Sequence, residues 1–384
     1  MTLEIHGTCE PGFEPLKAAL AANFADGFEI GASLAATVRG RPVLDIWAGH
    51  ADVARTRPWA RDTIVNVRSS TKIALQVMVL MLVERGRIAL DAPVADYWPA
   101  FAQGGKGEVT IRDVLAHRSG VPGLTPPPAD MSPYLDWDGI TARIAAEPHW
   151  FAGEPRIAYQ MVTSGFILGE VMRRVDGRLP RQFFDEEIGA PAGGIDLQIG
   201  VRDPSELPRV AETGWTRPPV DAEAPDPLAL RIYESLPLTD GPPSWAGLHA
   251  QFPASNAYTN ARALARVGEP LTNGGVLGGR RLFSEALARE CFVEQARGDC
   301  PIFGSVRLGL TLFLDQPDFP MPSPTAAYWG GAGGSLVVLD PAKGFSLAFA
   351  QNGMVSALPY DQETRRLRLW AAMSASLEAL PRVD

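Results

Sequence analysis

The run from residue 73 to residue 83, IALQVMVLMLV, is apolar at every position except Gln76. A helix formed by this run would be hydrophobic on every face, and such a helix is stable only when it is buried on all sides. The run is about half as long as a helix that spans a bilayer. It therefore predicts a central helix around which a large globular core must be built.

A candidate nucleophile stands directly ahead of this helix, in the sequence Arg68-Ser69-Ser70-Thr71-Lys72. Ser69 and Lys72 are three residues apart, so in a helix the hydroxyl and the amine lie on one face and within reach of each other. A serine beside an amine, at the positive end of a helix dipole, can become a nucleophile. Random placement of 18 Ser and 4 Lys over 384 positions gives about 0.2 such pairs. The position of the pair is therefore more informative than its spacing.

Lysine is rare in this chain, which holds 31 Arg and only 4 Lys. Lys17, Lys106 and Lys343 lie in contexts typical of helix surfaces or turns, whereas Lys72 opens the buried helix. Arginine does not lose its proton in proteins, but a desolvated lysine can. The use of Lys at position 72 thus predicts an amine that titrates and can accept the serine proton.

Composition excludes several classes of function. The chain has 384 residues, 46% of them hydrophobic, enough for a large core and two lobes. The net charge is -9 and no basic stripe is present, which argues against a nucleic-acid partner. The five histidines form no ligand pair, and Cys9, Cys291 and Cys300 form no CxxC motif. We therefore expect no metal and no cofactor.

The same features bear on location. An odd number of cysteines without a disulfide framework suits a reducing compartment. The first residues lack the basic and apolar regions of a signal peptide. We expect a cytoplasmic protein with no membrane partner. Its oligomeric state stays open.

Local patterns predict helices and strands at both ends of the chain and a mainly helical middle. The terminal segments are a helix over 12–25, a hairpin of strands over 30–38 and 43–48, a helix near 259–267, a half-buried strand over 306–314, a hairpin over 335–339 and 345–350, and a C-terminal helix whose apolar stripe ends at Leu380. The helices of the middle are expected over 110–117, 138–146, 161–175 and 180–187. These elements predict an α/β fold of the α+β type, with one antiparallel sheet flanked by helices.

In this fold, residues 1–90 and 255–384 form the sheet domain and residues 91–254 an inserted, mainly helical domain. Residues 215–253 carry eight prolines, which exclude a long helix or a central strand and leave a long loop. The loop is either a lid that faces the substrate or an irregular surface excursion.

Two further segments carry candidate site residues. Tyr159 precedes the helix that begins near residue 162 and can act as a second proton-handling group, or it simply packs its ring at the helix start. Residues 328–335, YWGGAGGS, are rich in glycine, which lets backbone N–H groups approach a substrate. Together with the Ser69 N–H they can form an oxyanion hole, or the segment is only a tight turn. The chain has no GxSxG motif, and His117 is interpreted as structural.

Taken together, these segments resemble the serine β-lactamase and penicillin-binding superfamily, and in particular its class C-like family VIII carboxylesterases. The resemblance covers nearly the whole chain. It rests on Ser69-Ser70-Thr71-Lys72 as an S-x-x-K element, residues 110–120 as a helix followed by an H-x-S-G segment, Tyr159 as the catalytic tyrosine followed by Gly165 and Leu168-Gly169-Glu170, and Trp329-Gly330-Gly331 as the third motif in its tryptophan form.

The resemblance implies a role for each of these residues. Ser69 would be the acyl-accepting nucleophile, with Lys72 and Tyr159 as its proton-handling pair. The backbone N–H groups of Ser69 and Ala332 would form the oxyanion hole. The substrate would bind beside the third motif, Trp329-Gly330-Gly331, with the Trp329 ring as a wall of its pocket.

Two departures from the family pattern narrow the expected substrate. Trp329 replaces the lysine of a K-T-G motif, and Met161 replaces the amide of a Y-x-N motif, so polar recognition is lost and apolar surface is gained. The sequence therefore favours hydrolysis of short-chain carboxylic esters, with β-lactam hydrolysis as a weak side activity at most. Alternatives on the same residues are a β-lactamase, a D-aminopeptidase or an acyltransferase. A non-catalytic binding module is a further alternative, although intact Ser69, Lys72 and Tyr159 speak against it.

Overall fold

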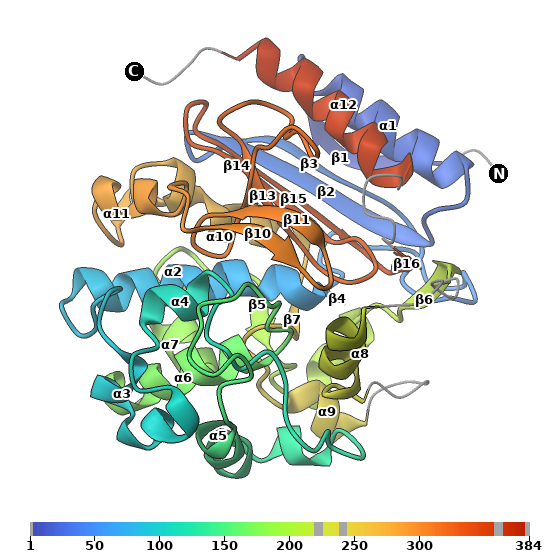
Figure 1. Ribbon diagram of the computed structural model, residues 1–384. Helices are drawn as coiled ribbons and strands as arrows, with labels where there is room; N and C mark the ends of the chain where they lie inside the picture. Colours follow the sequence, from blue (N-terminus) through green and yellow to red (C-terminus); the bar gives the residue numbers. More distant parts are fainter. Residues whose placement is uncertain (1–2, 219–225, 238–243, 357–363, 381–384) are drawn as a thin grey trace.

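A nine-stranded antiparallel sheet forms the upper half of the molecule (Figure 1). The computed structural model describes residues 3–218, 226–237, 244–356 and 364–380. The strand order is β1-β3-β2-β15-β14-β13-β12-β11-β10. The strands of this sheet are β1 Ile5–Cys9, β2 Gly31–Val38, β3 Arg41–Gly49, β10 Ala296–Cys300, β11 Gly304–Leu308, β12 Phe313–Leu314, β13 Ala327–Gly330, β14 Leu336–Asp340 and β15 Phe345–Gln351.

The two ends of the chain meet inside the sheet, where β2 pairs with β15. Leu34 lies opposite Phe349 and Ala36 opposite Leu347. Every residue of β15 is buried, which explains why its sequence is almost continuously apolar rather than alternating. The predicted fold class, an antiparallel sheet built from both termini and flanked by helices, is confirmed.

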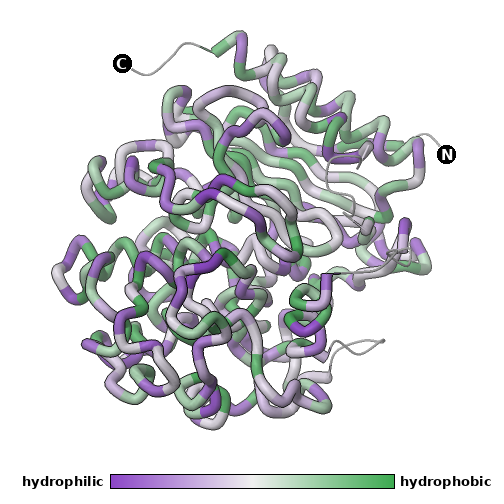
Figure 2. Tube along the Cα trace, viewed as in Figure 1, coloured by the Kyte–Doolittle hydropathy of each residue, from purple (hydrophilic) through white to green (hydrophobic). Residues whose placement is uncertain are grey.

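Helices cover both faces of the sheet. Helices α1 (Glu14–Ala25) and α12 (Thr364–Glu378) pack together over one face, while α10 (Ala261–Thr272) packs on β2 and β15 from the other (Figure 1). Figure 2 shows the hydrophobic residues concentrated along the strands between these layers. Helix α2 (Lys72–Glu84) lies beneath α10 and contacts α6 and α7 of the helical lobe on its other side. This position between the lobes explains why residues 70–82 are all buried, as the apolar run predicts.

The part of the chain from residue 91 to residue 254 is mainly helical in the described ranges. Its helices are α3 Val94–Tyr97, α4 Ile111–Leu115, α5 Trp137–Ala146, α6 Thr163–Asp176, α7 Pro180–Phe184, α8 Pro227–Glu234 and α9 Trp245–His249. Elsewhere in the described chain, the short strands outside the nine-stranded sheet and one further helix complete the structure. These strands are β4 Val65–Asn66, β5 Leu197–Ile199, β6 Gly214–Arg217, β7 Ala257–Thr259, β8 Val276–Leu277, β9 Arg280–Arg281 and β16 Gly353–Val355, and the helix is α11 Glu285–Glu290. The domain boundaries near residues 90 and 255 stay a prediction.

The prediction of one strand over residues 306–314 is wrong. Strands β11 and β12 are separate and are joined by a turn, in which the Gly309 N–H donates to the Leu312 carbonyl at 2.8 Å and Thr311 has a φ of 68°. Leu310 and Leu312 are both fully buried although they lie in the turn rather than in a strand. The alternation of apolar residues therefore continues through the turn, and the pattern alone hides it.

The proline-rich stretch 215–253 is not one continuous loop. Helix α8 starts at Pro227, a position that needs no backbone N–H, and the Asp226 side chain accepts bonds from the N–H groups of the next turn. Helix α9 is capped in the same way by Ser244. Proline thus begins a helix here instead of preventing one. Residues 219–225 and 238–243 of the stretch lie outside the described residues, and its role as a substrate-facing lid stays a prediction.

Candidate active site

Ser69 lies in a short 3₁₀ turn, Arg68–Thr71, that precedes α2. In a 3₁₀ turn residues i and i+3 are eclipsed, so Ser69 and Lys72 point to the same side. The turn is fixed by its neighbours, because Thr71 Oγ1 donates to the Arg68 carbonyl at 2.5 Å and accepts the Ala257 N–H at 2.8 Å. Ser69 is half-buried, whereas Ser70 and Thr71 are buried. Of the adjacent serines, Ser69 is therefore the accessible one.

The Lys72 side chain is buried, with 3% of its surface exposed. Its Nζ lies 2.8 Å from the Met161 carbonyl, 3.1 Å from the Ala254 carbonyl and 3.2 Å from the Tyr159 hydroxyl. Burial lowers the pKa of Lys72 well below its ordinary value, because the charged ammonium loses its hydration. The amine is thus held by two carbonyls, and its third neighbour is a hydroxyl that can exchange protons.

The close approach of α6 to the Ala254 segment builds this lysine pocket. Gly165 of α6 packs so tightly that an added Cβ would lie 2.6 Å from the Ala254 backbone nitrogen. A side chain at position 165 would push the segment away and remove the Ala254 carbonyl from Lys72. The glycine is therefore needed for its small size.

Tyr159 connects the lysine to the serine. Its hydroxyl lies 2.5 Å from Ser69 Oγ and 3.2 Å from Lys72 Nζ, and the ring is 7% exposed. The sequence predicts that the serine and the amine reach each other directly. In the described structure no hydrogen bond joins Ser69 Oγ to Lys72 Nζ, and the tyrosine hydroxyl stands between them. The three predicted catalytic residues thus form one continuous hydrogen-bonded chain.

His117 holds the Tyr159 segment in place. Its carbonyl accepts the Ala158 N–H at 2.9 Å, and its Nδ1 accepts the Gln160 N–H at 3.4 Å. Its ring meets the Tyr159 ring edge-on, with 5.0 Å between centroids. Burial, and secondarily the nearby Lys72, lower the pKa of His117 well below its usual range. The residue is neutral and positions the tyrosine, in agreement with its interpretation as structural.

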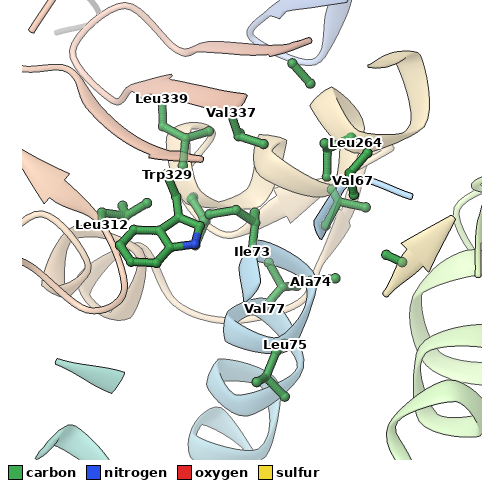
Figure 3. Close-up of a cluster of buried hydrophobic side chains, with 14 of the residues drawn as sticks. Val67, Ile73, Ala74, Leu75, Val77, Leu264, Leu312, Trp329, Val337 and Leu339 are labelled. Atoms are coloured by element: carbon green, nitrogen blue, oxygen red, sulfur yellow. The ribbon is translucent and has the colours of Figure 1, made fainter. Parts of the chain in front are cut away.

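Trp329, on β13, contacts the nucleophile turn from the sheet side. Its ring stacks between His117 and Phe313, at centroid distances of 5.2 and 4.9 Å, and its Nε1 donates to the Ser69 carbonyl at 2.9 Å. Figure 3 shows the ring above the N-terminal end of α2, among the aliphatic side chains of the core. Only 1% of the residue is exposed. Trp329 therefore positions Ser69, and its expected role as a wall of the substrate pocket stays a prediction.

The glycines that follow Trp329 place the end of β13 against the same turn. Gly330 pairs with Leu336, and a Cβ at Gly331 would lie 2.3 Å from the Val67 carbonyl oxygen. Ala332, in the next turn, is exposed. Neither its N–H nor that of Ser69 donates a hydrogen bond to a residue in the described ranges. Both predicted oxyanion donors are thus unoccupied by the protein's own acceptors.

Sequence reasoning missed other parts of the site. The Met161 and Ala254 carbonyls that hold Lys72 are backbone groups, so their residue types give no signal. Lys106, away from this site, lies in a turn, as its sequence context predicts. The turn is not at the surface, however, because Lys106 is fully buried and donates to the Gln103, Ala145 and Glu147 carbonyls.

No group of three or more His, Cys, Asp or Glu side chains that could hold a metal ion occurs among the described residues. Within the same residues, no helix combines the length and apolarity needed to cross a membrane.

Comparison with known proteins places this geometry in a family. The Beta-lactamase family matches residues 18–372. The chain is 32% identical over 371 residues to the esterase/β-lactamase LipL of Mycobacterium tuberculosis. The matched region covers 92% of this chain and 84% of LipL. Two solved structures each cover 97% of this chain and 100% of their own: a penicillin-binding protein homologue from Caulobacter crescentus (34% identity, TM-score 0.87) and a family VIII carboxylesterase (33% identity, TM-score 0.85). The chain therefore belongs to the Beta-lactamase family, within the serine β-lactamase and penicillin-binding superfamily that its motifs predict.

Proposed function

We propose that this protein is a serine carboxylesterase that hydrolyses short-chain carboxylic esters through an acyl-enzyme on Ser69. The observation that carries the proposal is the hydrogen-bonded chain from Ser69 Oγ through the Tyr159 hydroxyl to Lys72 Nζ. The esterase names of LipL and of EstB from Burkholderia gladioli support the enzyme class, a serine hydrolase; EstB is 28% identical over 79% of this chain.

Acylation begins when Ser69 Oγ attacks the ester carbonyl carbon. The serine proton passes to the Tyr159 oxygen, whose own proton can move to Lys72. A neutral lysine fits this role, because donation of its two N–H groups to the Met161 and Ala254 carbonyls would leave its lone pair to accept the Tyr159 proton. The N–H groups of Ser69 and Ala332 bind the oxyanion that forms.

Collapse of this intermediate breaks the ester bond. The departing alkoxide takes a proton from Tyr159, and the acyl group remains on Ser69. Water then attacks the acyl-enzyme along the same route, losing its proton to the tyrosine and lysine pair. The carboxylic acid leaves, and the serine recovers its proton.

The residue at position 329 supports esters over β-lactams. Position 329 offers an indole that is already stacked between two rings and bonded to Ser69, so it supplies no charge for a substrate carboxylate. Weak β-lactam hydrolysis remains part of the proposal, since the name of LipL combines both activities. The cytoplasmic location expected from the sequence stays a prediction.

The test compares p-nitrophenyl acetate and butyrate with a chromogenic cephalosporin, for the wild type, Ser69→Ala and Ser70→Ala. A fluorophosphonate probe reports the nucleophile by mass spectrometry. Ser70 is the matched control, because its buried hydroxyl lies 3.0 Å from Ser335 Oγ and belongs to the core. We expect ester turnover and probe labelling that Ser69→Ala abolishes and Ser70→Ala retains.

The alternatives give different results. Faster hydrolysis of the cephalosporin than of both esters would replace the esterase assignment with a β-lactamase. Absence of turnover together with absence of labelling at Ser69 would indicate a non-catalytic binding module.

A further inference from the structure

Arg68, the residue directly before the nucleophile, has a backbone conformation that is uncommon for its type. Its φ is 49°, in the left-handed region that long side chains rarely adopt. The conformation is held by the Arg68 N–H, which donates to Asn66 Oδ1 at 2.8 Å. Such outliers concentrate where the surrounding structure imposes them, often at functional sites.

The side chain of Arg68 starts beside the predicted oxyanion segment. Its Cβ would lie 3.1 Å from a Cβ added to Gly331, the residue before Ala332. Between residues 63 and 82, only Asn66, Arg68 and Ser69 are half-buried, and the rest are buried. Arg68 and the nucleophile Ser69 are thus adjacent, partly exposed positions in an otherwise buried segment.

The guanidinium of Arg68 has no acidic partner. It makes no hydrogen bond or ion pair with any residue in the described ranges, and the titratable group in electrostatic contact with it is Tyr258. Three other partly buried arginines, Arg112, Arg178 and Arg202, are paired with carboxylates, and Arg57, Arg181 and Arg266 donate to backbone carbonyls. Burial lowers the pKa of Arg68, which shows that its charge is poorly solvated.

A poorly solvated cation without an anion is costly, so a site that keeps one gains most when an anionic ligand arrives. The planar fork of a guanidinium matches the two oxygens of a carboxylate. Trp329 removes the cation that the K-T-G form of the third motif would supply, while Arg68 places a cation on the nucleophile turn itself. The site thus lacks a cation at position 329 and has one at position 68.

We propose that Arg68 binds a carboxylate of the substrate, so that the preferred esters carry a free carboxylate besides the ester group. This inference rests on the proposed esterase function and names the substrate class for the same site. The charge is supplied by the residue next to the nucleophile, within reach of either the acyl or the alcohol part of the ester.

The experiment uses two matched pairs of esters that differ only in a carboxylate or its neutral amide. Monoethyl adipate and ethyl 5-carbamoylpentanoate vary the acyl side, and 4-acetoxybenzoate and 4-acetoxybenzamide vary the alcohol side. For each pair we measure the ratio of kcat/KM, acid over amide. The variants are Arg68→Asn, which tolerates a positive φ, Arg68→Lys, and Arg289→Gln, which removes one exposed charge from α11 as the control.

The wild type should prefer the acid in at least one pair. Arg68→Asn should lower that ratio about 10- to 100-fold, as expected for a lost hydrogen bond to a charged group. Arg68→Lys should give an intermediate ratio, and Arg289→Gln should keep the wild-type ratio. Should Arg68→Asn fold poorly, added salt should still lower the wild-type ratio, because the pair is only partly buried.

Two results would overturn the inference. One is a wild-type ratio below one in both pairs, and the other is a ratio that neither Arg68→Asn nor salt changes. Either result leaves the esterase proposal intact if the enzyme hydrolyses the ester bond of the two amide-bearing substrates. If the wild type hydrolyses none of the four esters and Ser69 takes no probe, the esterase proposal itself fails and this inference fails with it.

Discussion

Lys72 and Lys106 are both buried lysines, and their partners explain why only one suits proton transfer. Lys106 donates to three backbone carbonyls, which accept hydrogen bonds but cannot relay a proton. Burial lowers its pKa to about 8, so it still carries its charge at neutral pH. Lys72 has two carbonyls and the Tyr159 hydroxyl, so its third position leads to Ser69. Burial alone therefore does not identify a catalytic lysine. What distinguishes Lys72 is its third hydrogen-bond partner, the Tyr159 hydroxyl.

Replacing Lys72 by arginine tests whether the amine must titrate. The Lys72→Arg variant keeps the positive charge but cannot accept a proton, so we expect kcat/KM on p-nitrophenyl butyrate to fall about 10²–10⁴-fold. Lys17→Arg, in the exposed face of α1, is the matched control and should retain wild-type rates. Near-normal activity of Lys72→Arg, with both proteins folded by circular dichroism, would contradict a titrating lysine.

The pH dependence of the reaction should report the same group. Because burial lowers the pKa of Lys72, the amine stays neutral to a pH well below the value near 10 at which lysine ordinarily titrates. Ester hydrolysis should therefore persist through neutral pH and fall on acidification, when Lys72 gains a proton. A kcat/KM profile between pH 5 and 10 measures this. Activity that appears only as the pH approaches 10 would show an ordinary lysine instead.

At the scale of elements, the contact between β13 and the nucleophile turn sets the geometry of the oxyanion segment. Gly331→Ala would place a Cβ 2.3 Å from the Val67 carbonyl oxygen and 2.4 Å from Ser335 Oγ, so the strand end must move away. We expect a loss of stability of about 1–3 kcal/mol and at least a tenfold drop in kcat. Thermal unfolding and ester kinetics measure both effects. Gly107→Ala, which meets no atom within 4 Å, is the control, and equal behaviour of the two variants would refute the argument.

Helix α10 carries a buried carboxyl that should make stability depend on pH. Burial raises the pKa of Glu269 to about 7 from an ordinary value of 4.5. Between these values the folded state holds a proton that the unfolded state has lost, so stability is full below pH 4.5 and declines as the pH rises through 7. A glutamine stays neutral throughout, so Glu269→Gln should gain Tm relative to the wild type between pH 5 and pH 8.5.

The control for this series is Glu285→Gln, an exposed glutamate at the start of α11. Its Tm difference from the wild type should be the same at both pH values. If Glu269→Gln behaves like this control, Glu269 titrates normally in the folded protein.

On the scale of the whole molecule, local patterns predict the architecture and motifs predict the site, but contacts between distant backbones are invisible in the sequence. The run 73–83 predicts the central helix because its apolar faces must all be covered. The acceptors of Lys72 are carbonyls, and Lys106 is buried because three more carbonyls surround it. The left-handed conformation of Arg68 has no sequence signal, and in the structure the Arg68 N–H donates to Asn66 Oδ1. The features that the sequence does not predict are mainly hydrogen bonds to backbone carbonyls and local backbone conformations.

The position of α2 also determines how the protein should unfold. The helix packs on α10 of the sheet side and on α6 and α7 of the helical lobe, so neither lobe keeps a complete core without it. We therefore expect a single calorimetric transition, in contrast to two lobes that melt separately. Leu80→Ala, at a fully buried position of α2, should lower the stability of the whole transition by about 2–5 kcal/mol without splitting it. Leu367→Ala, on the exposed face of α12, makes the same deletion at the surface and should leave the transition nearly unchanged. A second transition in Leu80→Ala would mean that the lobes fold independently and that α2 belongs to only one of them.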